Sequence, residues 1–162
     1  MASTDPVPRT TPIEVGDPAP PVVLADQSGA EVALAELPRP LMVFFYPRAN
    51  TPGCTTQACA MRDLAPDVPG VTIVGISPDT SRKQSNFDTK HELGYPLLAD
   101  VDHVAAEAFG VWQEKKNYGK TYMGVVRSAF LVGTDGTVVA AFPKISPKDT
   151  APKLLAALEE LS

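Results

Sequence analysis

The two cysteines are the residues of this chain best suited to covalent chemistry. Cys54 and Cys59 are its only cysteines, and they lie five positions apart. Two cysteines are too few for a disulfide framework, and a reducing cytosol would break a purely structural bridge. A four-ligand zinc site would also need His91 and His103, whose spacing matches zinc motifs poorly. The close pair therefore favours a catalytic dithiol that needs neither a metal nor a cofactor.

Cys54 stands where the sequence changes from strand-like to helix-like. Residues 41–46 are a continuous apolar run that ends at Pro47, as expected of a strand buried on both faces. Thr51 suits the N-cap of a helix over residues 51–64, with a proline at the first helical position. Cys54 then falls in the first helical turn, where unpaired N–H groups and the helix dipole favour the thiolate.

Ionisation alone does not make a thiol a fast nucleophile, because the change that favours the thiolate also weakens its nucleophilicity. A high reaction rate must come from groups placed where charge develops on the leaving group. The Thr51 hydroxyl can donate to and accept from a bound substrate, and Arg127, at the start of a predicted strand, can supply a fixed cation. We expect Pro47 to shield the thiolate from water. Gly53 would let the Cys54 N–H approach the substrate.

The pattern Pro47–x3–Thr51–x2–Cys54 resembles the active-site signature of the peroxiredoxins. The fuller TPGCT run at 51–55, with Cys59 after it, is similar to the peroxiredoxin Q or bacterioferritin comigratory protein subfamily. Further matching stretches are VGISPD at 74–79, YPLLAD at 95–100, YGKT at 118–121 and GVVRSAF at 124–130. The resemblance spans roughly residues 13–160, in the order that the family has.

The resemblance implies a thiol-dependent peroxidase that reduces hydrogen peroxide and organic hydroperoxides. It implies that Cys54 is the peroxidatic cysteine, that Cys59 is the resolving cysteine, and that Thr51 and Arg127 hold the peroxide. The Cys54 sulfenic acid would form an intramolecular disulfide with Cys59, which thioredoxin or a similar dithiol protein would reduce. Such a pair needs no partner subunit, so a monomer is expected. The family usually has Glu where Gln57 stands, which leaves the role of a charge there open.

Helical geometry sets a condition on that disulfide. Residues five apart in a helix have rotated by about 500°, and their Cα atoms lie about 8 to 9 Å apart, beyond the ~7 Å limit for a disulfide. A bridge between the two cysteines therefore requires the helix to unwind. We expect an intact helix in the reduced protein and a partly melted one in the oxidised protein.

The order of elements predicts an α/β protein with a thioredoxin-like fold, in which helices flank a central mixed sheet. We expect a flexible N-terminal arm at 1–15, which is rich in proline, and one domain at 16–162. Lys115, Lys116 and Lys120 are expected in a solvated, flexible stretch. The expected strands are 21–24, 32–34, 41–46, 71–76, 96–98, 125–132 and 137–142, the last two joined by a turn, and the expected helices are 51–64, 80–93, 103–109 and 149–161.

Composition excludes several classes of function. With 162 residues, 44% apolar and 20% charged, the chain has the balance of a single globular domain. A net charge of −5 argues against nucleic acid as a partner, and no polybasic stretch suggests a membrane anchor. The longest apolar run is far below the ~20 residues of a membrane-spanning helix. The first ten residues lack the apolar core of a secretory signal, so a cytoplasmic location is expected.

Three other functions fit parts of the pattern. A thioredoxin-type oxidoreductase is disfavoured because no C-x-x-C pair is present. A redox sensor or holdase would be oxidised but would turn over poorly, so recycling by thioredoxin distinguishes it from a peroxidase. A metal-binding module is the weakest alternative. Simpler interpretations also stay open, with Cys59 as core packing, Thr51 as an N-cap alone and Arg127 as a surface residue.

Overall fold

Strand β3 (Leu41–Phe45) lies near the middle of a seven-stranded mixed sheet in the computed structural model, which describes residues 7–161. The strand order is β2-β1-β5-β4-β3-β8-β9. β3 pairs in parallel with β4 (Thr72–Ser77) and antiparallel with β8 (Ser128–Val132). The remaining strands of the sheet are β1 (Val23–Ala25), β2 (Glu31–Ala33), β5 (Leu97–Ala99) and β9 (Val138–Phe142). Every residue of β3 is buried, which explains its unbroken apolar sequence.

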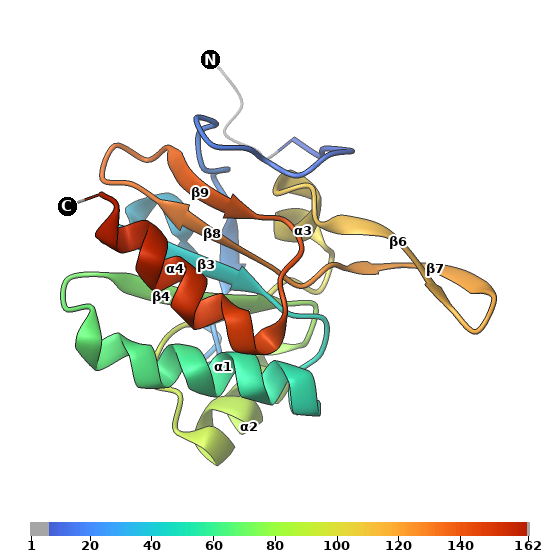
Figure 1. Ribbon diagram of the computed structural model, residues 1–162. Helices are drawn as coiled ribbons and strands as arrows, with labels where there is room; N and C mark the ends of the chain where they lie inside the picture. Colours follow the sequence, from blue (N-terminus) through green and yellow to red (C-terminus); the bar gives the residue numbers. More distant parts are fainter. Residues whose placement is uncertain (1–6, 162) are drawn as a thin grey trace.

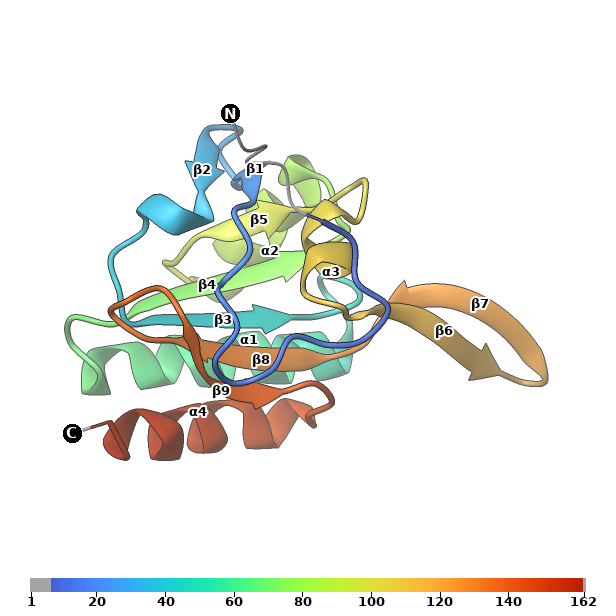
Figure 2. The ribbon, with the colours of Figure 1, turned by 90° about the horizontal axis from the view of Figure 1, so that it is seen from above.

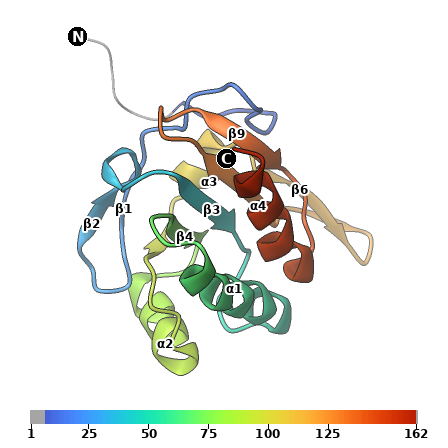
Figure 3. The same cartoon turned by 60° about the vertical axis from the view of Figure 1, so that its left-hand side comes forward.

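Helices cover both faces of this sheet. α1 (Pro52–Leu64), α2 (Ser81–His91) and α4 (Thr150–Glu159) lie side by side along one face (Figures 1 and 3). The short α3 (Val104–Ala108) lies on the other face, together with the N-terminal segment (Figure 2). Alternate residues of β3 face opposite sides of the sheet, since Met42 and Phe44 pack with α1 and Phe45 packs with α3. The predicted α/β fold with a central mixed sheet is confirmed.

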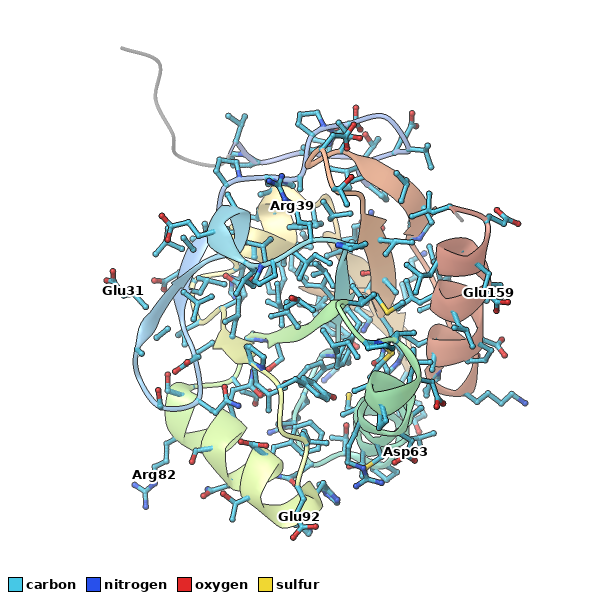
Figure 4. The ribbon with its side chains drawn as sticks, turned by 90° about the vertical axis from the view of Figure 1, so that its left-hand side faces the viewer. Glu31, Arg39, Asp63, Arg82, Glu92 and Glu159 are labelled. Carbon is cyan, nitrogen blue, oxygen red and sulfur yellow. The ribbon has the colours of Figure 1, made fainter. Side chains whose placement is uncertain are left out.

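Short 3-10 turns complete the chain and place charged residues at its surface. They are η1 (Leu34–Glu36), η2 (Ala65–Asp67) and η3 (Pro147–Asp149). The charged side chains labelled at the rim of Figure 4, such as Glu31, Arg82 and Glu159, point away from the body.

Across residues 7–161, no helix combines the length and the apolar character needed to span a membrane. Nor do three or more His, Cys, Asp or Glu side chains of that range gather where they could hold a metal ion.

The N-terminal segment is more ordered than the sequence suggested. The N–H groups of Arg9 and Ile13 donate to carbonyl groups at the end of α3, at 2.9 and 3.0 Å, and Ile13 is buried. The expectation of a flexible arm over 1–15 is therefore wrong for residues 9–15, while residues 1–6 lie outside the described part of the chain. Prolines excluded a helix here, but they did not prevent an extended segment from packing across the sheet. The structured unit begins before the predicted boundary at residue 16.

A second departure is a two-stranded ribbon that projects from the body (Figures 1 and 2). β6 (Trp112–Asn117) pairs antiparallel with β7 (Lys120–Val125) in a sheet of their own. The turn places Tyr118 and Gly119 at positive φ of 52° and 77°, as a tight hairpin of this twist requires. This turn chemistry was the signal that sequence analysis missed.

The ribbon corrects two sequence predictions. Lys115, Lys116 and Lys120 belong to paired strands and not to a flexible stretch. The single strand expected over 125–132 is interrupted, because β7 ends at Val125 and β8 begins only at Ser128. Arg127 lies in this break between the two sheets.

We expect Gly110→Ala to loosen the N-terminal segment. Gly110 has φ of +73°, and a Cβ built on it would overlap the backbone carbonyl of Thr11. Gly94 is a matched control, because its φ is +74° and a Cβ there meets nothing within 4 Å. By urea denaturation, Gly94→Ala should lower the free energy of unfolding by ~1 kcal/mol, the usual cost of this backbone region. Gly110→Ala should cost at least ~1 kcal/mol more. Equal losses in the two variants would contradict the packing of this segment.

Candidate active site

Cys54 occupies the first turn of α1 and is fully buried. Thr51 has the extended backbone of an N-cap residue, and its carbonyl accepts from Thr55 N at 2.8 Å. The helix starts as predicted, with a proline at its first position. Cys59 lies farther along the same helix and is half-buried, and both cysteines are free thiols. Cys54 therefore belongs to the turn of a thirteen-residue helix whose N–H groups have no partner within the helix.

Arg127 lies 73 residues after Cys54 in the sequence, and its side chain contacts the Cys54 thiol. Its Nη1 lies 3.4 Å from the Sγ of Cys54. Arg127 is not the first residue of a strand, as the sequence had suggested, but lies in the break between β7 and β8. Its carbonyl accepts from Ile145 N at 3.0 Å, and the neighbouring Val126 N donates to Val111 O at 2.8 Å. These backbone bonds fix the segment from which the guanidinium extends.

Gln57 orients the guanidinium. It is fully buried, and its Oε1 accepts from Nη1 of Arg127 at 2.7 Å. Its amide nitrogen donates to Thr150 Oγ1 at 3.2 Å, at the start of α4. Sequence analysis left the role of a charge at this position open, and the structure shows a neutral amide that aims the cation. Among the described residues, the ion pairs are Arg9–Asp17 and Arg62–Asp63, and neither neutralises Arg127.

The Thr51 side chain does not cap the helix. Its Oγ1 donates to the carbonyl of Arg48 at 2.8 Å, inside the loop that follows β3. Thr51 is thus an N-cap by backbone conformation only. With its proton committed to Arg48, the hydroxyl keeps its lone pairs as acceptors.

Gly53 and Pro47 frame the site in different ways. A Cβ on Gly53 would lie only 3.1 Å from Nη2 of Arg127, so the glycine makes room for the guanidinium. The sequence predicts a different role for Gly53, in which it lets the Cys54 N–H approach the substrate. Pro47 is half-buried and begins the loop after β3, and its shielding of the thiolate stays a prediction.

A buried polar network holds the loop between β3 and α1. A carboxylate oxygen of Asp79 accepts from Ala49 N and from Ser77 Oγ, both at 2.7 Å. Gln84 donates to Ser77 Oγ at 2.8 Å and accepts from the hydroxyl of Tyr46. Burial raises the pKa of Tyr46 above its ordinary value, so this hydroxyl stays protonated and donates. The sequence of residues 74–79 resembles the family but indicates no role. In the structure, Ser77 and Asp79 of this stretch hold the loop before α1.

Lys115 is a second cation near the thiol, which sequence analysis placed in a solvated stretch. Its side chain crosses over Gly124, where a Cβ would come within 2.9 Å of the Lys115 Cδ. Its Nζ donates to the carbonyl of Val125 at 2.9 Å, two residues before Arg127. Burial lowers the pKa of Lys115, the charge of Arg127 lowers it further, and Cys54 opposes the shift. Lys115 therefore lies within electrostatic reach of both site groups.

A buried thiol at a helix start, in contact with a fixed guanidinium, can act as a nucleophile toward a bond whose cleavage leaves negative charge on the departing atom.

The AhpC/TSA family model matches residues 15–141 of this chain. The chain is 40% identical to peroxiredoxin Bcp of Bacillus subtilis over 153 residues, which cover 93% of this chain and 98% of the relative. The chain belongs to the AhpC/TSA family. It is a peroxiredoxin, and thiol-dependent peroxidase activity is its family's chemistry.

Other relatives agree with this membership. The peroxiredoxin is 45% identical to peroxiredoxin Bcp of Escherichia coli K12 over 134 residues, covering 81% of this chain and 86% of the relative. The solved structure of BcpB from Mycobacterium tuberculosis matches with a TM-score of 0.82 and 37% identity, over 93% of this chain and 99% of that one. Bacterioferritin comigratory protein of Xanthomonas campestris, whose structure concerns alkyl peroxide reduction, matches with a TM-score of 0.80 and 36% identity, over 86% and 90%. The resemblance drawn from the sequence is confirmed.

We expect Lys115→Met to slow the reaction of this peroxiredoxin with hydrogen peroxide. Removing a nearby cation weakens the field at the thiolate, and a loss of about three- to tenfold in the second-order rate constant is expected at low ionic strength. Lys116→Met is the matched control, because Lys116 is the next residue of the same strand but is exposed. It should change the rate constant by less than about twofold. Equal effects of the two substitutions would show that Lys115 has no special place at the site.

Proposed function

We propose that Cys54 is the peroxidatic nucleophile of a peroxidase that reduces hydrogen peroxide and organic hydroperoxides. The observation that carries this proposal is the 3.4 Å contact between the Arg127 guanidinium and the Cys54 sulfur. A cation held there favours the thiolate and the charge that develops on the departing oxygen. The named activity of the Xanthomonas campestris relative on alkyl peroxides supports the inclusion of organic hydroperoxides.

The first step forms an S–O bond and breaks the O–O bond. The Cys54 thiolate attacks the terminal oxygen of the hydroperoxide and becomes a sulfenic acid, and the remaining oxygen leaves as water or an alcohol after taking up a proton. Thr51 holds the attacked end, because its hydroxyl donates to Arg48 and so accepts from the O–H of the peroxide. Arg127 and the N–H groups of the first turn donate to the oxygen pair.

In the second step, the Cys59 thiol attacks the sulfenic sulfur, water leaves, and a Cys54–Cys59 disulfide forms. This step requires α1 to unwind, since its helix is continuous over Pro52–Leu64 while both thiols are free. Helical geometry separates the two Cα atoms by about 8 to 9 Å, more than a disulfide allows. The half-buried position of Cys59 supports the proposal, because it leaves this sulfur less firmly packed than a core thiol.

An external dithiol protein of the thioredoxin type then reduces the disulfide and restores both thiols. The cycle uses two cysteines of one chain, so a monomer suffices. It also depends on both cysteines being returned to the thiol form, which fits a reducing compartment such as the cytoplasm.

The test mixes fully reduced protein with one equivalent of hydrogen peroxide or an organic hydroperoxide, and follows peroxide loss and free thiols together. The wild type should lose peroxide and two thiols rapidly, and Cys54→Ser should abolish the reaction. Cys59→Ser should react once and accumulate sulfenic acid, because nothing resolves it. Addition of thioredoxin and its reductase should sustain turnover only when both cysteines are present.

Two results would contradict the proposal. Peroxide consumption no faster than that of a free thiol would show that the site lacks functional donors. Rapid oxidation that thioredoxin does not reverse would favour a redox sensor over a recycling enzyme.

A further inference from the structure

Two hydrogen bonds tie α1 to the end of α2 and to the segment that follows it. The Tyr95 hydroxyl donates to the carbonyl of Ala58 at 2.7 Å. Nη1 of Arg62 donates to the carbonyl of His91, also at 2.7 Å. Ala58 and Arg62 flank Cys59 on the helix. The turn that carries Cys59 is therefore fixed from outside the helix as well as by the helix's own bonds.

Burial and packing on the central sheet hold the Tyr95 ring independently of α1. It is 7% exposed, and its ring meets Phe44 of the central strand edge-on, with ring centroids 5.9 Å apart. Burial raises the pKa of Tyr95, and the neighbouring Tyr46 and Cys59 raise it further, so the hydroxyl remains a donor at neutral pH. A ring held by the sheet cannot follow Ala58 out of a helical turn, so unwinding must break this bond.

The hydrogen bonds of Gln57, in the same turn of α1, serve a different purpose. Gln57 bonds to Arg127 and Thr150, at the proposed peroxide site. Changing Gln57 would therefore disturb the peroxide step and the unwinding step together. Tyr95 donates to a backbone carbonyl of the turn and makes no hydrogen bond to Cys54, Thr51 or Arg127 in the described structure. It acts on the helix without touching the reacting atoms.

We propose that Tyr95 is a positioning residue that latches the Cys59 turn of α1 and so sets how fast Cys59 reaches oxidised Cys54. This inference rests on the proposed function, in which Cys59 is the resolving cysteine. While the Tyr95–Ala58 bond holds, the helix stays folded and the peroxide site stays assembled. When it opens, the turn can unwind and the disulfide can form.

The latch has a chemical consequence for the sulfenic acid. A slow opening leaves the sulfenic acid waiting beside Arg127, where a second peroxide can oxidise it. That reaction transfers one oxygen to the sulfur, converts sulfenic to sulfinic acid, and releases water or an alcohol from the peroxide. Tyr95 therefore shifts the balance between disulfide formation and irreversible oxidation of Cys54.

The test is Tyr95→Phe, which removes the hydroxyl but keeps the ring that packs on Phe44. Tyr118→Phe is the matched control, because Tyr118 is 98% exposed at the tip of the ribbon. After rapid mixing with peroxide and acid quench, mass spectrometry counts the sulfenic, sulfinic and disulfide forms. Tyr95→Phe should raise the first-order rate of disulfide formation about fivefold, the usual effect of one lost hydrogen bond. It should raise the peroxide concentration needed for sulfinic acid by a similar factor.

Peroxide consumption itself should change by less than about twofold in both variants, since the groups on the thiol are intact. A purely structural role for Tyr95 would lower stability without speeding the disulfide step. Arg62→Met, which removes the neighbouring tie from a partly exposed position, should change disulfide formation in the same direction if Tyr95→Phe does not fold.

The latch is overturned if Tyr95→Phe folds and forms the disulfide no faster than wild type, or if, with Tyr95→Phe unfolded, Arg62→Met leaves the rate unchanged. A wild-type protein that reduces peroxide but never forms a Cys54–Cys59 disulfide gives a different result. It would overturn the resolving step of the proposed function, and the latch with it.

Discussion

The contact between Arg127 and the Cys54 sulfur is the interaction on which the rest of the site depends. The cation that contacts this buried sulfur comes from a residue 73 positions away in the sequence. The surrounding structure is arranged to keep the guanidinium in place. The break between β7 and β8 supplies its backbone, Gln57 aims its nitrogen, and Gly53 leaves it room.

In the proposed catalytic cycle, the same helix must satisfy two opposing demands. The peroxide step needs α1 folded, because the first turn supplies Cys54, its N–H groups and the Gln57 contact. The disulfide step needs α1 unwound, because a helix holds the two cysteines too far apart. The contacts around α1 match these two demands, because Gln57 bonds to Arg127 and Thr150, while Tyr95 bonds to the carbonyl of Ala58. A helix held too firmly would resolve slowly, and one held too loosely would not keep the thiol assembled.

Local patterns made much of this predictable, and long-range packing limited the rest. The apolar run of β3 and the Thr51–Pro52 helix start follow from local chemistry, and the structure contains both. The ribbon was missed because its polar, lysine-rich strands pair only with each other, so no buried face marks them. The packed segment around Ile13 is not predictable in this way, because a proline-rich sequence is compatible with both a flexible arm and an extended packed segment. Lys115 and Tyr95 donate to backbone carbonyls, which carry no sequence signal.

The most direct test of the central claim is the second-order rate constant for hydrogen peroxide in Arg127→Gln and Arg127→Lys. Gln removes the charge, while Lys keeps a charge but loses the planar fork that contacts the thiol and Gln57 together. The account predicts a loss of about a hundredfold or more for Gln, and only a small recovery for Lys. A rate constant for Arg127→Gln within about threefold of wild type would contradict it, since the thiol would then react without its fixed cation.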